Sequence, residues 1–362
     1  MAIAIDTPHG VDALTQFILF HDEVYQRTRT VRWSAVVPFQ LPMLLGDSPF
    51  CEDRTLRPFA AREGGRMVAR VVAVVDRRYQ RHWNERLGHV VLYEALPDAR
   101  AATRAVMDAA CEWLAAEGAV DARAGSGLLE FPFVIDDHEK LPPVWLRQNP
   151  AYYHALLKDA GFETEQGWVD YKIAVTPQLV ERWTSALEAV RRGGFEIVPL
   201  KDVPESDRAH VFTALWNETF RAHWGYTPFS EAEMVHVMQA FAVAGMFETS
   251  VVAYRDRQPL GALWVVPETT MLAAVDAGRT LAPDEKLNVL GIGVREAARG
   301  RGVNTGMAAF AYLELARRGA THVSYTLVLD HNWPSRRTAE KLGAAVCANY
   351  VTYRRRFARV SR

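Results

Sequence analysis

The stretch Arg299-Gly300-Arg301-Gly302 places two guanidinium groups and two glycines between an apolar run and a run of helical composition. Glycine lets backbone N–H groups approach an anion closely, and a helix N-terminus adds about half a positive charge there. Arg299 and Arg301 can add charge-assisted hydrogen bonds, and Thr305 could cap the helix or contact an oxygen of the anion. The pattern predicts a phosphate-binding loop between a strand and a helix.

Two common phosphate-binding loops do not fit this spacing. The chain contains no G-x-x-x-x-G-K-[ST] run, which excludes the loop of nucleoside-triphosphate-binding proteins. A dinucleotide-binding G-x-G-x-x-G would need its third glycine where Thr305 stands, and Gly306 comes one residue too late. That motif also requires an acidic residue about 20 positions further on, after a second strand.

The elements that must position this loop follow the same order in two halves of the chain. In the second half, β-rich runs predict strands at 251–254, 260–266, 287–294, 322–329 and 347–357, and helices at 305–318 and 334–342. In the first half, a Glu63-Gly64-Gly65 turn joins two strands, and further strands at 88–96 and 167–173 accompany helices at 99–117 and 151–160. This duplication predicts two α/β domains, residues 1–193 with a linker helix at about 176–192, and residues 194–362.

The composition is that of a globular protein. Its 362 residues are 49% hydrophobic and 23% charged, and 42 Lys and Arg against 43 Asp and Glu leave a net charge of −1. We therefore expect no nucleic-acid partner and, without a long apolar run, no membrane partner. The three cysteines match no metal-ligand spacing, so no metal is predicted. Reduced cysteines and the lack of a signal-peptide pattern at the N-terminus lead us to expect a cytoplasmic protein.

Two ordered motifs in the second half resemble those of the GNAT N-acetyltransferase superfamily. Val294, Arg299, Gly300 and Gly302 match its pyrophosphate loop, V-x-x-x-x-[QR]-G-x-G-x-[GA]. One helix and one strand later, Asn332-x-x-Ser335 and Glu340-Lys341-Leu342-Gly343 are similar to its second motif, N-x-x-[AS]…Y-E-K-x-G-F. The resemblance extends to an uncharacterised bacterial group of tandem-GNAT proteins and covers about residues 55–357. It implies two tandem GNAT-like domains of the α/β (α+β) class, each with a mixed, mostly antiparallel sheet flanked by helices.

The resemblance also implies a cofactor, acetyl-CoA or another acyl-CoA, in the second domain. The pantetheine arm would lie between splayed strands 287–294 and 322–329, and loop amides would hold the pyrophosphate. Asn332 could instead be only a helix cap ahead of Pro334. The cofactor-binding residues implied are Ile292, Val294, Arg299, Gly300, Arg301, Gly302, Val303, Asn304, Thr305, Asn332 and Ser335.

The sequence departs from the family pattern at two positions. Asn304 stands where the loop has its third Gly or Ala, so its side chain could crowd the diphosphate or donate to it. Ala339 stands where the family's frequent general acid, a Tyr, precedes the Glu-Lys pair. The protonation of the leaving thiolate would then fall to another residue, with Tyr325, Tyr350 and His331 as the alternatives nearest in sequence.

An amine acceptor needs a base, and the acceptor side of such folds is formed by the first helices of the domain and their loop. Glu218 and His223 are the candidate bases there, although their five-residue spacing does not put them on one helix face. Trp224 and Tyr226 could bind the acceptor or simply pack on the core. Ser230 and Glu233 form a capping-box pattern and are read as structural.

The first half has Pro97-Asp98-Ala99-Arg100 where the second has its glycine loop, so we predict that this half binds no CoA. The function predicted is acyl-CoA-dependent N-acyl transfer, with acetyl to a small-molecule amine as the leading case, by a monomer or homodimer. Two alternatives stay open: a catalytically silent CoA-binding or interaction protein, and transfer from aminoacyl-tRNA.

Overall fold

The computed structural model describes residues 2–128, 130–267, 274–275 and 278–357. The first half contains strands β1 to β7 and helices α1 to α5, and helix α6 leads into the second half. The strands are β1 (Ile3–Asp6), β2 (Arg54–Glu63), β3 (Arg66–Asp76), β4 (Leu87–Ala95), β5 (Asp121–Ala124), β6 (Phe133–Val134) and β7 (Glu163–Ala174). The helices are α1 (Val11–Thr28), α2 (Val37–Leu45), α3 (Arg77–Trp83), α4 (Arg100–Ala116), α5 (Tyr153–Asp159) and α6 (Pro177–Arg192).

The second half repeats this succession of helices and strands. Its strands are β8 (Glu196–Pro199), β9 (Val251–Arg255), β10 (Gln258–Val266), β11 (Val289–Val294), β12 (His322–Leu329) and β13 (Ala345–Arg356). Its helices are α7 (Glu205–Thr219), α8 (Glu231–Ala242), α9 (Met246–Thr249), α10 (Val303–Arg317) and α11 (Trp333–Leu342). The predicted strand at 322–329 has the observed bounds, and the predicted strand at 287–294 begins two residues later.

Local sequence explains where several elements begin and end. Gly64 and Gly65 both have positive φ, 56° and 82°, which is the backbone conformation of the tight turn between β2 and β3. Gly343 adopts φ 94° directly after α11, as the left-handed residue that ends a helix. Ser230 and Glu233 form the predicted capping box at the start of α8.

The two halves share one sheet. Its strands are ordered β1-β2-β3-β4-β5-β13-β7-β12, with β6 beside β13, and a second sheet is ordered β11-β10-β9-β8. Between the named strands of the described chain, β4 and β5 form a parallel pair and every other pairing is antiparallel.

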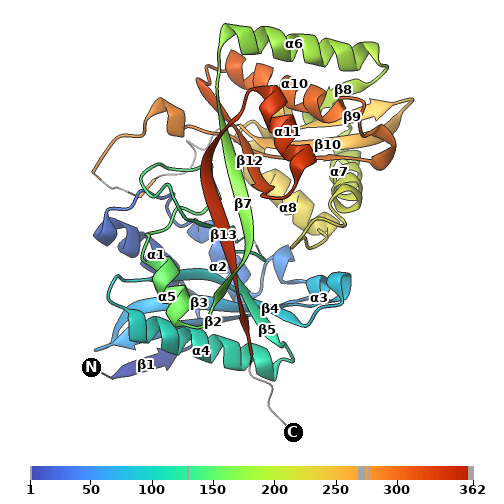
Figure 1. Cartoon of the computed structure of the whole chain (residues 1–362). Helices are drawn as coiled ribbons and strands as arrows, with labels where there is room; N and C mark the ends of the chain where they lie inside the picture. The colour runs from blue at the N-terminus through green and yellow to red at the C-terminus, as the bar shows by residue number, and fades with distance from the viewer. Residues whose placement is uncertain (1, 129, 268–273, 276–277, 358–362) are drawn as a thin grey trace.

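Strands β7 and β13 run side by side along the length of the molecule (Figure 1). The C-terminal part of β7 pairs with β12 in the second half, whereas the C-terminal part of β13 pairs with β5 in the first half. Each half therefore completes its sheet with residues from the other. The boundary at 193/194 stays a proposal, because these two strands belong to both halves.

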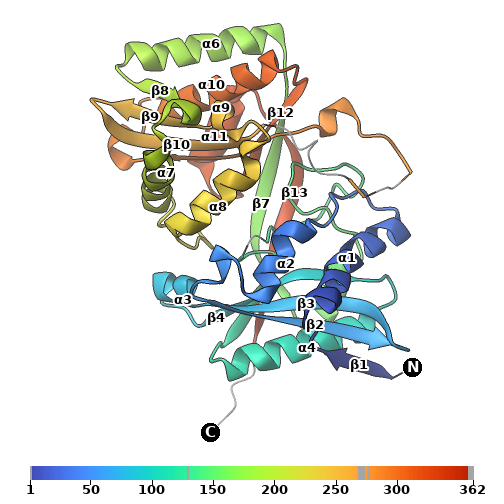
Figure 2. The same ribbon diagram turned by 180° about the vertical axis from the view of Figure 1, so that it is seen from behind.

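Helices cover the sheets at both ends and at the junction between them. Helix α4 covers the first-half strands, α6 and α10 pack on each other in the second half, and α7 and α8 face α2 and α3 across the junction (Figures 1 and 2). One hydrophobic core joins the first-half strands to buried residues of α7 and α8, such as Leu215 and Val237. A second core lies under α6, α10 and α11. The first core therefore extends across the junction between the two halves.

Candidate functional site

A wedge opens between β11 and β12. The strands touch where Ser324 N donates to Asn288 Oδ1 at 2.8 Å and Leu290 N donates to Thr326 Oγ1 at 3.3 Å. In the described residues no ladder of backbone hydrogen bonds joins them, since β11 pairs with β10 and β12 pairs with β7. The splayed strands predicted from the sequence are therefore present.

A backbone irregularity in β12 shapes one side of the wedge. The register of β12 against β7 shifts between Tyr325 and Val328, and Leu327 between them has φ 35°. The amide of Leu327 donates to Oδ1 of the buried Asp170 on β7 at 3.1 Å. Burial raises the pKa of Asp170 to about 7. The hydrogen bond to this carboxyl group stabilises the irregular backbone of β12 at Leu327.

The predicted phosphate loop leads from β11 to α10. Gly300 and Gly302 have φ 73° and 77°, and Gly302 is the residue before the first turn of α10. A Cβ added at Gly300 would meet nothing within 4 Å, so the loop faces open space. Arg299 and Arg301 are both exposed, and the first amides of α10 have no carbonyl partner in their own helix. The loop can therefore present backbone donors and two cations to an anion.

The structure resolves the departure at Asn304. Its side-chain Nδ2 donates to Thr338 Oγ1 on α11 at 3.0 Å, and its Oδ1 accepts from the amide of Thr305 at 2.9 Å. The side chain thus ties α10 to α11 and is engaged within the protein. Gly306 serves packing, because a Cβ there would lie 2.7 Å from Val190 of α6.

The N-terminus of α11 faces the wedge. Asn332 caps this helix, with its Oδ1 accepting from Ser335 N at 3.3 Å. Ser335 Oγ lies 3.0 Å from the hydroxyl of Tyr325, and burial raises the pKa of this tyrosine to about 12. Asn332, Ser335 and Tyr325 all line the cavity described next.

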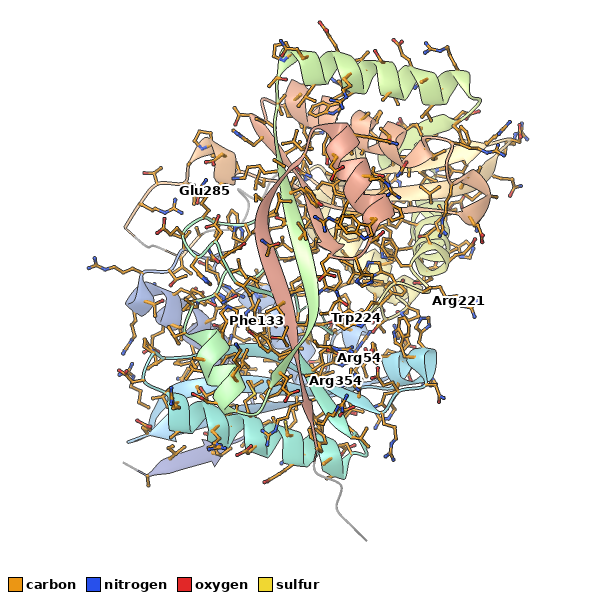
Figure 3. All side chains as sticks on the ribbon, viewed as in Figure 1. Arg54, Phe133, Arg221, Trp224, Glu285 and Arg354 are labelled. Carbon is orange, nitrogen blue, oxygen red and sulfur yellow. The ribbon has the colours of Figure 1, made fainter. Side chains whose placement is uncertain are left out.

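A cavity of about 410 Å³ lies between the two halves and is continuous with the wedge. Residues of β11 and β12 form one side, the segment 220–229 after α7 forms another, and first-half residues form the far wall. Figure 3 shows Trp224 and Arg54 close to this junction. The aromatic residues of the wall are Phe50, Phe131, Trp145, Trp168, Trp216, Phe220, Trp224, Tyr226, Phe229, Trp264 and Tyr325.

The segment 220–229 is attached to α3 of the first half through its backbone carbonyls. His82 Nε2 donates to Arg221 O at 2.7 Å, Trp83 Nε1 to Tyr226 O at 2.8 Å, and Arg78 Nη1 to Pro228 O at 3.1 Å. This attachment fixes the wall that carries Trp224 and Tyr226.

Both predicted acceptor-binding residues line the cavity. The ring of Trp224 lies 4.3 Å from Arg123 Cζ and 5.8 Å from the Trp168 ring. The hydroxyl of Tyr226 donates to Asn217 Oδ1 at 2.5 Å. Arg123 of the first half thus packs on Trp224, and Asn217 of the second half binds the hydroxyl of Tyr226. Both rings form part of the cavity wall.

Two of the four candidate catalytic residues line the cavity and the other two do not. His223 lines the cavity, partly buried among Phe220 and Trp168, and this burial lowers its pKa from the ordinary value. Tyr325 lines it as well. Glu218 does not line the cavity: its side chain is 55% exposed and paired with Arg295 at 2.8 Å. His331 is 65% exposed beside Asp330, also outside the cavity wall.

The remaining two positions considered for the general acid are buried in cores. Tyr350 is 2% exposed and packs with Trp168 and Leu329. Ala339 is fully buried against α10 and β12, where it belongs to the second core. Among the alternatives, Tyr325 is the hydroxyl that reaches the wedge.

The corresponding wedge of the first half is filled by its own side chains. β4 and β5 pair from Leu87 to Val90 and then part, and Leu92 on β4 has φ 52°. Glu130 Oε2 accepts from the Leu92 amide at 2.8 Å, and Glu130 Oε1 is ion-paired with Arg147, which is 1% exposed. A carboxylate and a guanidinium therefore occupy the point where these strands separate.

Sequence reasoning missed most of the cavity wall. Trp145 comes from the loop after β6, and Trp168, Trp216 and Trp264 come from β7, α7 and β10, so no spacing rule brings them together. The one local signal was the run Gly291-Ile292-Gly293, because a Cβ at Gly291 would lie 2.6 Å from Trp216. The two glycines allow α7 to pack closely on β11.

Comparison with known proteins shows which family and which solved structures this chain resembles. Residues 195–344 match the acetyltransferase (GNAT) family. A tandem GNAT protein from the clavulanic acid biosynthesis pathway superposes with a TM-score of 0.59 over 98% of both chains, at 13% identity. A glucosamine N-acetyltransferase region of a fungal multi-domain β-N-acetylglucosaminidase also gives 0.59, at 17% identity, over 98% of this chain and 38% of that one.

A curated relative is the bacterial ceramide synthase of Caulobacter vibrioides. It is 28% identical over 193 residues, 51% of this chain and 49% of the relative. The matched part of the chain thus spans about half the length of that relative.

The family match and the similar structures support an acetyltransferase enzyme. Residues 195–344 are thus similar to the acetyltransferase (GNAT) family, and the fold of the chain is similar to that of a tandem GNAT protein. The predicted fold class, a mixed and mostly antiparallel sheet flanked by helices in a tandem arrangement, is confirmed. No helix in the described residues is long and apolar enough to cross a membrane. Those residues also contain no group of three or more His, Cys, Asp or Glu side chains arranged to hold a metal ion.

Proposed function

We propose that the protein transfers an acyl group from acyl-CoA to an amine, and that the second half holds the reaction centre. The amine acceptor and the thioester would meet where the wedge opens into the cavity. Acyl-CoA supplies an acyl group that is activated as a thioester. The relative named ceramide synthase supports amide formation, because ceramide is an N-acylated amino alcohol.

The residues of the loop fit a diphosphate. Arg299 and Arg301 are exposed cations on either side of Gly300, and the amides at the start of α10, apart from that of Thr305, which donates to Asn304 Oδ1, could donate to an anion. Ile292 lies at the cavity wall on β11, and Asn332 with Ser335 faces it from α11. These residues would hold the pyrophosphate and the pantetheine arm.

Two residues on the cavity wall are suited to move the protons. His223 accepts a proton from the attacking amine, because its lowered pKa keeps the imidazole neutral at physiological pH. Tyr325 remains protonated because its pKa is raised to about 12, and it donates to the departing sulfur. The nitrogen–carbon bond forms, the carbon–sulfur bond breaks, and the products are an amide and a thiol.

The observation that carries this proposal is the open wedge with the glycine loop at one end and the cavity at the other. A metal-free acyl transfer needs a positioned thioester, an acceptor site and proton-transfer groups. Arg299 on the loop supports the first requirement, and the cavity wall with His223 and Tyr325 supports the other two.

Titration calorimetry with CoA and acetyl-CoA tests the proposal. The double variant Arg299→Ala, Arg301→Ala is expected to weaken binding by about 100-fold or more, since each of the two lost hydrogen bonds to a charged group is worth about 1.5–3 kcal/mol. Arg191→Ala with Arg192→Ala, two exposed arginines at the end of α6, is the matched control. Absence of binding by the unchanged protein, or equal binding by the double variant, would contradict the proposal.

A catalytically silent CoA-binding protein is the second candidate, and it is favoured by Ala339 at the position of the family's acid. Thiol release from acyl-CoA in the presence of a panel of amines separates the two candidates. Silent binding predicts CoA affinity without thiol release, and acyl transfer predicts both. Salt-dependent binding of aminoacyl-tRNA would instead favour the tRNA-dependent alternative.

A further inference from the structure

The cavity is larger and more apolar than an acetyl group and a small polar amine require. Its volume of about 410 Å³ lies in the range of sites for whole organic ligands. Most of its wall is apolar, with Trp145, Trp216 and Trp264 among the largest side chains.

The charges on the wall are already neutralised within the protein. Arg54 Nε donates to Asp76 Oδ2 at 2.7 Å, and the same guanidinium pairs with the fully buried Glu233. Glu130 pairs with Arg147. These three charged wall residues, Arg54, Asp76 and Glu130, thus leave no uncompensated charge for a charged ligand group to match.

The polar groups of the wall that suit chemistry gather at the wedge. Tyr325, Thr326, Asn332 and Ser335 belong to β12 and α11, and His223 lies on the facing segment. The far wall is formed by first-half residues such as Phe50, Val144 and Trp145. An occupant therefore has a reactive polar end at the wedge and an apolar body directed to the first half.

Trp145 marks the end of this apolar space. It lines both the large cavity and a separate polar cavity of about 100 Å³ that is bounded by His21, Arg32 and Glu94. Its ring packs edge-on against Phe241 at 4.4 Å and near Trp264 at 6.2 Å. Its φ of 73° is rare for a bulky residue, so surrounding packing holds it in place.

We infer that the cavity binds the hydrocarbon chain of a long-chain substrate, and that Trp145 of the first half limits the length of that chain. The inference rests on the proposed acyl transfer and names the substrate class. The chain belongs either to the acyl group of the thioester or to the amine acceptor. The first half, whose own wedge is filled, then contributes the chain-binding wall.

Binding of two homologous series tests this inference: n-alkylamines from butyl to hexadecyl, and acyl-CoAs from acetyl to palmitoyl, all below their micelle concentrations. Affinity is measured by calorimetry and by the fluorescence of the cavity tryptophans. Affinity is expected to rise about fourfold per methylene in one of the series, up to a limiting length, because each buried CH₂ contributes about 0.8 kcal/mol. The series that shows this rise identifies the source of the chain.

Two variants move the limit in opposite directions. Trp145→Ala should extend the limiting length, and Val237→Phe on α8, which narrows the cavity, should shorten it. Trp113→Ala, a half-buried tryptophan of α4 outside the cavity, is the matched control and should leave the limit unchanged. If Trp145→Ala fails to fold, Val237→Phe still tests the wall.

The outcomes separate this inference from the proposed function. Binding of CoA with no dependence on chain length in either series overturns the inference and leaves acyl transfer standing. Length-dependent binding of amines without any CoA binding supports the chain site and overturns acyl transfer. A limit that neither variant moves overturns the role of Trp145 and of this cavity.

Discussion

The two wedges of this molecule begin alike and end differently. In each half, two parallel-running strands touch at one end and then separate, at Val90 and Ala124 in the first half and at Leu290 and Thr326 in the second. The first wedge is closed by Glu130 and Arg147, whereas the second opens into a cavity of about 410 Å³. The two halves thus share the arrangement of their strands, although charged side chains of the protein fill the wedge in the first half.

The loops that follow the two wedges differ in the same sense. Arg299-Gly300-Arg301-Gly302 leads into α10 with two left-handed glycines. The first half reaches α4 through 96–99, which contains Pro97 and no glycine. The first half therefore lacks the glycine loop that could bind an anion, and its wedge is also filled.

The largest expected effect concerns the histidines of the two halves. His223→Gln should lower kcat for acyl transfer by about 10²- to 10⁴-fold, the usual contribution of a general base. The control is His21→Gln in the first half. His21 is also buried, and burial lowers its pKa well below the ordinary value, but it lies outside the cavity. The kcat of this variant should therefore stay close to that of the unchanged protein.

The pH profile of kcat/KM checks the same prediction. Because burial lowers the pKa of His223, the neutral base persists as pH falls, and the rate should decline only below the ordinary histidine pKa of about 6.5. A decline centred at or above that value, or an unchanged rate in His223→Gln, would contradict the role assigned to His223.

The second prediction concerns the ion pair between Glu130 and Arg147 that fills the first-half wedge. Glu130→Ala leaves the buried Arg147 its second carboxylate partner, Glu94 at 3.4 Å, and should lower the free energy of unfolding by about 1–3 kcal/mol, measured by urea denaturation. The affinity of the second half for CoA should stay unchanged. Glu117→Ala removes an exposed pair with Arg77 and should cost less than about 1 kcal/mol. A second CoA equivalent bound by Glu130→Ala would show that the first wedge is only blocked.

The smallest expected effect concerns Asn304. Its amide is engaged with Thr338, so Asn304→Ala should cost about 1 kcal/mol of stability and change CoA affinity by less than about twofold. A tenfold loss of CoA affinity, measured by calorimetry, would instead show that this side chain contacts the diphosphate.

The sequence by itself predicted the loop and many of the elements, because these depend on local patterns. A β-rich run of eight residues predicted β12 at His322–Leu329, and the Glu63-Gly64-Gly65 turn predicted the hairpin of β2 and β3. The spacing of Val294, Arg299, Gly300 and Gly302 indicated the anion loop, since a short loop carries its own geometry. Asn332 as a helix cap was likewise readable from the residues that follow it.

Only the tertiary structure decided the rest of the site. The strands β7 and β13 cross between the halves, and no local pattern records which partner a strand will pair with. Glu130 and Arg147 close the first wedge from loop positions that carry no periodic signal. The cavity wall unites Trp145, Trp168, Trp216 and Trp264 from across the chain, because burial of large apolar surfaces at the junction is a property of the whole packed molecule.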